Sequence, residues 1–304
     1  MHNLALLLKS YREDLAYAER LFESFSFHNP TLLHMYVMVP DQDVILFSHL
    51  NSPCSTVLAE SELSHQLVSE GLAGLTAGYI NQQIVKLSFW ELGLASNYFC
   101  IDSDAIIIRD ITVDDFLAPD GFPYTVMVED RELKVEPRYY QQYWKSRETA
   151  LQRINSEIGL ADPVIRTCHG HQIFSSDVLR SFKHDFLDNR KWSYADALEV
   201  APYEFSWYTL WLQASREIPV HSIEPLVKVF HHEEQHFEYA IRRVTEEDMA
   251  RGYLAVVLNS NFSRDLGLNP ITGDKVSLLA PYLSYQEVVR LISTKLRDSI
   301  RRRI

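Results

Sequence analysis

The chain has 304 residues, of which 46% are hydrophobic and 23% charged. This balance is ordinary for a folded domain and excludes an intrinsically disordered chain, which has too few apolar residues to bury. Lys and Arg number 29 against 41 Asp and Glu, so the formal net charge is −12. A field of that sign opposes nucleic-acid binding, which depends on neutralising phosphates. We therefore expect no nucleic-acid partner.

The cysteines and the apolar segments of the sequence indicate the cellular compartment in which the protein is expected. Cys54, Cys100 and Cys168 are an odd number without ligand spacing, which excludes a disulfide framework and fits a reducing compartment. The apolar run at residues 4–8 is too short for a signal-peptide core and is followed by Lys9. No stretch approaches the roughly 20 apolar residues of a membrane span. These features predict a cytoplasmic protein.

Short apolar strands alternate with amphipathic helices along the chain. A first helix is expected between Ser10, which forms a capping-box pattern with Glu13, and the stop at Asn29-Pro30. Strands are expected at residues 4–8, 34–39, 98–101, 105–108, 124–128, 172–174 and 226–230. Further helices are expected at residues 81–94, 137–158, 176–189 and 204–214. This alternation predicts an α/β sheet, with ligands at the carboxyl ends of its strands.

The C-terminal residues 284–304 differ in character from the rest. Apolar side chains recur there every three or four residues, and Arg and Lys occupy much of the remainder. One interpretation is a basic amphipathic helix that contacts an anionic membrane peripherally, on its cytoplasmic face. The other is a terminal helix packed on the protein, with cations complementing its own dipole. We predict a main domain at residues 1–245 and a C-terminal extension at 246–304.

The segment Asp102-Ser103-Asp104 directly follows an apolar strand. Two carboxylates one residue apart can chelate a hard divalent cation, and that cation can hold a diphosphate. A second copy, Asp41-Gln42-Asp43, is predicted to be a solvated turn. Asp102 and Asp104 have apolar residues on both sides, and buried carboxylates need a cation or hydrogen-bond donors nearby. The first pair is therefore the predicted metal site.

Residues 99–108, with this pair at their centre, resemble the metal-binding segment of nucleotide-sugar glycosyltransferases with the GT-A fold. Residues 9–15 resemble the nucleotide-contacting turn of that fold, and residues 78–87 resemble a helix that some bacterial members place before the metal strand. The resemblance covers residues 1–245 in order, through short stretches, and is nearest to bacterial enzymes of the Asp-x-Asp type. It implies a GT-A-like mixed, mainly parallel sheet flanked by helices, with a C-terminal helical extension, and it names no particular sugar.

The resemblance also implies roles for particular residues. Asp102 and Asp104, on either side of Ser103, would bind Mn²⁺ or Mg²⁺ and the diphosphate or ribose of a nucleoside-diphosphate sugar. The other expected donor contacts are Lys9, Ser10, Tyr11, Asp14, Gln83 and Lys86. An alternative interpretation of Lys86 is a surface cation near Glu91.

Three further roles follow from the same resemblance. Either His231 or His232, after a short strand, would supply another metal ligand. Glu204 would be the general base of an inverting reaction, with Asp130 in reserve; the alternative for Glu204 is a helix N-terminal residue stabilised by the macrodipole. Residues 169–172 would line the acceptor cleft.

Three other classes of function compete with this prediction. His232-Glu233-Glu234-Gln235-His236 fits the pattern of zinc peptidases, although the segment is polar nearly throughout. A nucleotidyltransferase usually carries a glycine-rich loop after its first strand, and residues 9–12 contain no glycine. A non-catalytic sugar-binding module is the third. We predict a metal-dependent glycosyltransferase that uses a UDP-sugar and a glycan, lipid-linked or small acceptor; the sugar, stereochemistry and oligomeric state stay open.

Overall fold

The computed structural model describes residues 1–127, 137–161, 171–230, 239 and 242–257. The chain divides into two compact units. Unit 1 comprises Met1–Arg12, Thr31–Ile101 and Thr112–Pro225, and unit 2 comprises Glu13–Pro30, Asp102–Ile111 and Leu226–Ile304. The division at residue 245 stays a prediction, and the apolar and basic stripe of residues 284–304 lies outside the described residues.

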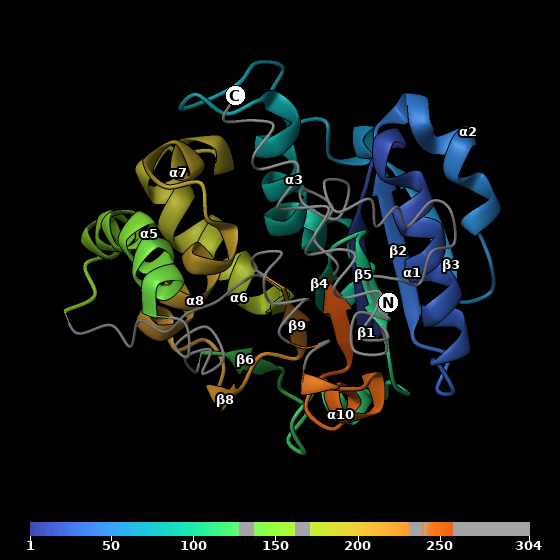
Figure 1. Ribbon diagram of the computed structural model, residues 1–304. Helices are drawn as coiled ribbons and strands as arrows, with labels where there is room; N and C mark the ends of the chain where they lie inside the picture. Colours follow the sequence, from blue (N-terminus) through green and yellow to red (C-terminus); the bar gives the residue numbers. More distant parts are fainter. Residues whose placement is uncertain (128–136, 162–170, 231–238, 240–241, 258–304) are drawn as a thin grey trace, which may run out of the picture. The chain divides into compact units, whose positions relative to one another are not determined.

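Unit 1 is built on a five-stranded sheet in the order β3-β2-β1-β4-β7 (Figure 1). These strands are β1 (His2–Lys9), β2 (His34–Val39), β3 (Ser55–Ala59), β4 (Ala95–Ile101) and β7 (Ile173–Ser175). The first four are parallel, and β7 pairs with β4 antiparallel. Strand β1 is apolar over residues 4–8 because a parallel strand is covered on both faces, and all five side chains are buried. The predicted mixed, mainly parallel α/β sheet flanked by helices is confirmed.

The register of these strands places their carboxyl ends at one edge. Leu8 lies opposite Val37 of β2 and opposite Ile101 of β4. The segments that follow Lys9, Val39 and Ile101 therefore leave the sheet at the same edge, where α/β proteins usually bind their ligands.

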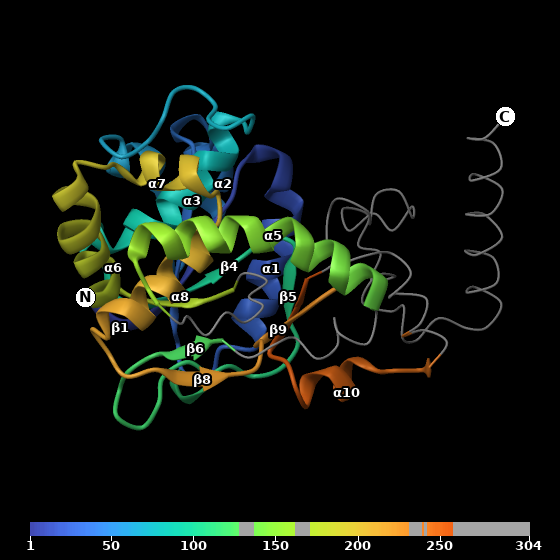
Figure 2. The ribbon, with the colours of Figure 1, turned by 90° about the vertical axis from the view of Figure 1, so that its left-hand side faces the viewer.

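The remaining elements of unit 1 cover this sheet. Its helices are α2 (Val44–Phe47), α3 (Ala77–Ser88), α5 (Pro137–Ile158), α6 (Ser176–Ser181), α7 (Tyr194–Val200) and α8 (Glu204–Ser215), with a π-helix at Phe182–Asp188. Helix α5 packs against α7 and α8 (Figure 2). Strands β6 (Tyr124–Val126) and β8 (His221–Ile223) form a separate parallel pair. The core is rich in aromatic rings, among them Tyr98, Phe174 and Trp207, all fully buried.

Unit 2 contains a smaller, three-stranded sheet in the order β5-β10-β9. Its elements are α1 (Leu15–Phe27), β5 (Ala105–Ile107), β9 (Val227–Val229), α10 (Glu246–Ala250) and β10 (Ala255–Val257). Helix α1 packs against β5, and the backbone N–H of Ile107 donates to the hydroxyl of Ser24 at 3.1 Å. Strand β10 pairs antiparallel with β5 and parallel with β9.

Short 3-10 helices occupy several connections of the described chain. They span Arg12–Asp14, Asp41–Asp43, Ser48–Leu50, Glu60–Leu63, Phe89–Leu92 and Val113–Asp115. The first of them replaces the predicted capping box, since α1 begins only at Leu15. Ser10 does not cap this helix: its hydroxyl has no hydrogen-bond partner among the described residues, and its backbone N–H donates to the carbonyl oxygen of Met38 on the neighbouring strand, at 3.0 Å.

A second sequence prediction is also corrected. Asp43 is only 1% exposed and is no solvated turn residue. Its carboxylate accepts hydrogen bonds from the backbone N–H of Arg12 at 2.9 Å and from the guanidinium of Arg12 at 2.8 Å. These two donors, of which the guanidinium is positively charged, replace the hydrogen bonds to water that the buried carboxylate has lost.

Neither a membrane helix nor a disulfide is found in the part of the chain that the structure describes. None of its helices combines the length and the apolar character that crossing a bilayer requires. Cys54 and Cys100 are free thiols.

Three buried tyrosines make the stability of the fold sensitive to alkaline pH. Burial raises the pKa of Tyr98, Tyr194 and Tyr208 above the ordinary value of 10.0. The unfolded chain releases these protons first, so the stabilisation is complete below about pH 10 and is lost as pH rises above it. We expect the free energy of unfolding to fall by about 1.4 kcal/mol per pH unit for each such tyrosine.

Urea unfolding at intervals from about pH 8 to about pH 11 measures this slope. Tyr208→Phe should reduce the slope of the free energy of unfolding against pH by the contribution of one tyrosine, about 1.4 kcal/mol per pH unit. Tyr124→Phe is the control, because Tyr124 is only half-buried. A stability that stays level over this range would contradict the prediction.

Candidate functional site

The Asp102-Ser103-Asp104 turn lies in the chain between β4 and β5. It is closed by the backbone N–H of Ala105, which donates to the carbonyl oxygen of Asp102 at 3.1 Å. The hydroxyl of Ser103 donates to Oδ2 of Asp14, just before α1, at 3.0 Å. Asp102 and Asp104 are half-buried. Unit 2 thus brings together Asp14 and Ser103, two of the residues that the sequence singled out, beside the predicted metal pair.

The donor set of this turn suits a hard cation. Carboxylate oxygens are the ligands that Mg²⁺ and Mn²⁺ prefer, and Mg²⁺ commonly binds one or two carboxylates and completes its shell with water and substrate phosphates. Among the described residues no group of three or more His, Cys, Asp or Glu side chains could hold a metal ion. Asp102 and Asp104 are two carboxylates and so do not make up such a group, and their role as metal ligands stays a prediction.

Several candidate residues lie outside the described part of the chain. These are Asp130, the histidines His231 and His232, the rest of the zinc-peptidase pattern up to His236, and residues 169–170 of the predicted acceptor cleft. Their roles stay predictions.

The carboxyl end of β1 carries a buried cation. Lys9 is 9% exposed, and its ammonium lies 2.8 Å from Oε1 of Glu60 and 2.7 Å from the carbonyl oxygen of Ser10. Glu60 directly follows β3 and was missed by the sequence analysis, because the strand before it was not predicted. The hydroxyl of Ser10 is buried without a hydrogen-bond partner among the described residues, and Tyr11 is exposed. A donor contact at these residues stays a prediction.

Helices α3 and α8 of unit 1 are joined by a buried ion pair. The ammonium of Lys86 lies 3.2 Å from Oε1 of Glu204, and the two side chains are 5% and 10% exposed. The same ammonium lies 4.8 Å from the centre of the Phe205 ring. The alternative interpretation of Lys86 as a surface cation near Glu91 is wrong, because the first turn of α8 covers it and supplies its counter-ion.

Gln83 precedes Lys86 by three residues on α3, so the two share one face of the helix. The side chain is 3% exposed, and neither its amide nitrogen nor its amide oxygen has a hydrogen-bond partner within the described residues. Tyr79, one turn earlier, is half-exposed. Its pKa is raised by burial and by the nearby charge of Glu204.

Helix α3 is held in place at both ends. The hydroxyl of Thr76 caps its start by accepting from the backbone N–H of Tyr79 at 3.3 Å. This start lies four residues earlier than predicted. Near its end, the hydroxyl of Tyr98 on β4 donates to the carbonyl oxygen of Lys86 at 2.6 Å. The backbone that carries Gln83 and Lys86 is therefore fixed against the sheet.

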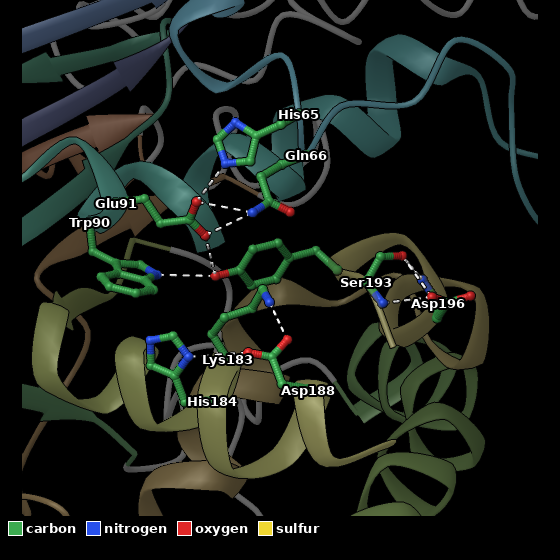
Figure 3. A network of polar contacts seen from close by, with 10 residues as sticks. His65, Gln66, Trp90, Glu91, Lys183, His184, Asp188, Ser193 and Asp196 are labelled. Carbon is green, nitrogen blue, oxygen red and sulfur yellow. Dashed lines mark hydrogen bonds and ion pairs between the residues drawn. The ribbon is translucent and has the colours of Figure 1, made fainter. Parts of the chain in front are cut away.

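A polar network just beyond α3 adds to this support (Figure 3). The carboxylate of Glu91 accepts hydrogen bonds from His65, Gln66 and Tyr194 at 3.0–3.1 Å. The indole N–H of Trp90 donates to the hydroxyl of Tyr194 at 3.1 Å. Burial, and then the charge of Glu91, raises the pKa of Tyr194, which keeps the phenol a neutral donor. The network joins the segment after β3 to α7.

Of the predicted acceptor cleft, the structure describes His171 and Gln172, and lining of an acceptor site by them stays a prediction. The side-chain amide of Gln172 accepts from the backbone N–H of Val126 at 3.1 Å and donates to its carbonyl oxygen at 2.7 Å. It therefore completes the pairing of β6. His171 is buried, with a left-handed φ of 59°.

Residues 3–248 of the sequence match a protein family described as a family of unknown function, DUF6492. The chain belongs to this family. A search of curated proteins finds no match.

Solved structures similar to this DUF6492 member include three proteins. Mouse xyloside xylosyltransferase 1, in its apo form, is 12% identical over 85% of this chain and 98% of its own, with a TM-score of 0.44. Galactosyltransferase LgtC, in complex with donor and acceptor sugar analogues, is 10% identical over 83% and 86%, with a TM-score of 0.46. The bifunctional glycosyltransferase WbbM, in its apo form, is 11% identical over 92% and 51%, with a TM-score of 0.46. All three names are those of glycosyltransferases.

Because the Lys86–Glu204 pair is buried, removing one partner should destabilise the protein more than removing both. Lys86→Met leaves the Glu204 carboxylate buried without its cation, which should destabilise the protein by about 3–5 kcal/mol. Glu204→Leu should also lower the free energy of unfolding, because it leaves the Lys86 ammonium buried without its anion. The double variant Lys86→Met/Glu204→Leu should recover most of the loss, because two apolar side chains need no compensation. Urea unfolding measures all four proteins, and strictly additive losses would contradict the pairing.

Proposed function

We propose that this protein is a metal-dependent glycosyltransferase of GT-A type, which moves a sugar from a nucleoside diphosphate to the hydroxyl of an acceptor. The observation that carries the proposal is the Asp102-Ser103-Asp104 turn, with Ser103 held by Asp14 at 3.0 Å. The turn presents two half-buried carboxylates directly after a parallel strand, with the chemistry that a hard cation and a diphosphate require. The proposed donor is a UDP-sugar, and the proposed acceptor is a glycan, a lipid-linked sugar or a small molecule.

Asp102 and Asp104 are the proposed ligands of Mn²⁺ or Mg²⁺. The bound cation would supply electrostatic stabilisation of the charge that develops on the leaving diphosphate. Asp14 holds the turn through Ser103, which keeps the two carboxylates pre-positioned for the ion. The proposed donor contacts are Lys9, Ser10, Tyr11, Asp14, Gln83 and Lys86.

Glu204 is the proposed general base if the reaction inverts configuration, with Asp130 in reserve. Its carboxylate begins α8 and is held by Lys86. A base in this position would take the proton from the acceptor hydroxyl as that oxygen attacks the sugar. The proposed location is the cytoplasm, with peripheral membrane contact through residues 284–304.

Substitution of the metal pair tests the proposal. Asp102→Asn and Asp104→Asn should each reduce the release of nucleoside diphosphate from a panel of nucleotide sugars by on the order of 100-fold or more. The cause would be loss of the cation, so excess EDTA should have the same effect on the unmodified protein. Melting temperatures should stay close to that of the unmodified protein, because the turn keeps its backbone hydrogen bond.

Asp41→Asn is the matched control. Asp41 belongs to the second Asp-x-Asp segment, is exposed, and accepts a hydrogen bond from the backbone N–H of Ser61 at 3.1 Å that an asparagine oxygen can also accept. This variant should retain full activity. Full activity of both Asp102 and Asp104 variants, or of the protein in EDTA, would overturn the metal mechanism.

A further inference from the structure

Helix α1 lies alongside β5, the strand that follows the Asp102 turn (Figure 2). Hydrogen bonds join the helix to this part of the chain just before its start, in its second half and just after its end. In chain order they run from Ser103 to Asp14 at 3.0 Å, from Ile107 to Ser24 at 3.1 Å and from Ile111 to His28 at 2.9 Å. All of these residues belong to unit 2. The segment Asp102–Ile111 is therefore held against α1 at points spread along its length.

The bond to Ser24 satisfies a backbone group that the sheet leaves over. Strand β5 is an end strand, with β10 as its neighbour in the sheet. The backbone N–H of Ile108 donates to Leu254, just before β10, at 3.0 Å, so the preceding N–H of Ile107 points to the opposite edge. Ile107 is 2% exposed, and a buried N–H needs an acceptor. The hydroxyl oxygen of Ser24 is that acceptor.

The hydroxyl of Ser24 is itself held in one orientation. It donates to the carbonyl oxygen of Leu21, three residues earlier on α1, at 2.8 Å. A hydroxyl can donate and accept at once, so the same oxygen serves both the helix and the strand. Alanine has a higher helix propensity than serine. The bond that Ser24 accepts from β5 therefore explains a serine at this position.

The path from Ser24 to the metal pair is short. Strand β5 begins at Ala105, directly after Asp104, and Ile107 is its last residue. The backbone N–H of Ala105 closes the turn by donating to the carbonyl oxygen of Asp102 at 3.1 Å. Strand and turn are thus one bonded unit. A movement of β5 away from α1 would displace the two carboxylates.

We propose that α1 positions the metal pair, with Ser24 acting through β5 and Asp14 acting through Ser103. Ser24 is then a positioning residue for Asp102 and Asp104. This inference rests on the proposed function and adds to it a residue that lies outside the turn. Residues that hold metal ligands through hydrogen bonds typically change metal affinity by about 10- to 100-fold when they are substituted.

Mn²⁺ binding tests this inference without any measurement of activity. Electron paramagnetic resonance of the free ion follows titrations with Mn²⁺ alone and with Mn²⁺ plus UDP, GDP or dTDP. Ser24→Ala should weaken Mn²⁺ binding by about tenfold. Ser24→Thr should bind Mn²⁺ more tightly than Ser24→Ala, because a helical threonine keeps the hydroxyl and its bond to the preceding turn. Unchanged Mn²⁺ affinity in Ser24→Ala overturns the inference and leaves the proposed function standing. If the unmodified protein binds no Mn²⁺ under any of these conditions, both fail together.

Ser48→Ala is the matched control. The hydroxyl of Ser48 donates to the carbonyl oxygen of Ile45 at 2.7 Å, three residues earlier, as that of Ser24 does to Leu21, but it lies in unit 1. This variant should leave Mn²⁺ binding unchanged. A merely structural role of Ser24 would lower the melting temperature of Ser24→Ala without changing the Mn²⁺ affinity measured well below it. That result would overturn the inference.

Ser103→Ala keeps the inference testable if Ser24→Ala does not fold. It removes the bond to Asp14 at the start of α1 and leaves the bond between Ile107 and Ser24 in place. We expect Mn²⁺ binding to weaken here by about tenfold as well. Glu23→Ala, which removes an exposed carboxylate of α1, is the control for Asp14→Ala and should bind Mn²⁺ as the unmodified protein does. Unchanged Mn²⁺ binding in both Ser103→Ala and Asp14→Ala would overturn the positioning role of α1.

Discussion

The parallel pairing of β1 with β2 on one side and β4 on the other determines where the candidate groups of unit 1 lie. Because all three strands run in one direction and are in register at Leu8, their following segments leave one edge of the sheet. Strand β1 ends at this edge with Lys9, and strand β4 ends with Ile101, which Asp102 follows in the chain. Strand β4 also anchors α3, through the hydrogen bond from Tyr98 to the carbonyl of Lys86. The sheet therefore fixes both the strand ends and the helix that carries Gln83.

Around this frame, unit 1 buries polar groups that a purely structural core would avoid. An ion pair such as Lys86–Glu204 contributes little net stability, since desolvation offsets its attraction, and apolar side chains of similar size often serve the fold as well or better. The unpartnered Gln83 amide is a direct cost. Positions where local rules of stability are broken are where function is expected. By contrast, the polar residues around Glu91 bond to one another, and these hydrogen bonds hold the segment that follows α3 against α7.

Local patterns predicted the local structure well. The apolar run at residues 34–39 coincides with β2, and the amphipathic pattern at 137–158 coincides with α5. Strand β3 was missed because it is an edge strand whose side chains are mostly half-buried, so it lacks the continuous apolar run of a central strand. The contacts of the candidate site could not be predicted at all. The ion pairs Lys86–Glu204 and Lys9–Glu60 form because the topology of the sheet and its helices brings distant parts of the chain together. The spacing of residues in the sequence does not indicate such pairs.

The most direct test of the central claim is a thermal-shift screen of nucleoside diphosphates and their sugars, each with and without Mn²⁺. A ligand at 100 times its dissociation constant adds about 2.7 kcal/mol of stability, enough to raise the melting temperature of a protein of this size by a few degrees. The account predicts stabilisation by one nucleotide and its sugars only when Mn²⁺ is present. No shift with any nucleotide, alongside a clear response to Zn²⁺ alone, would contradict it.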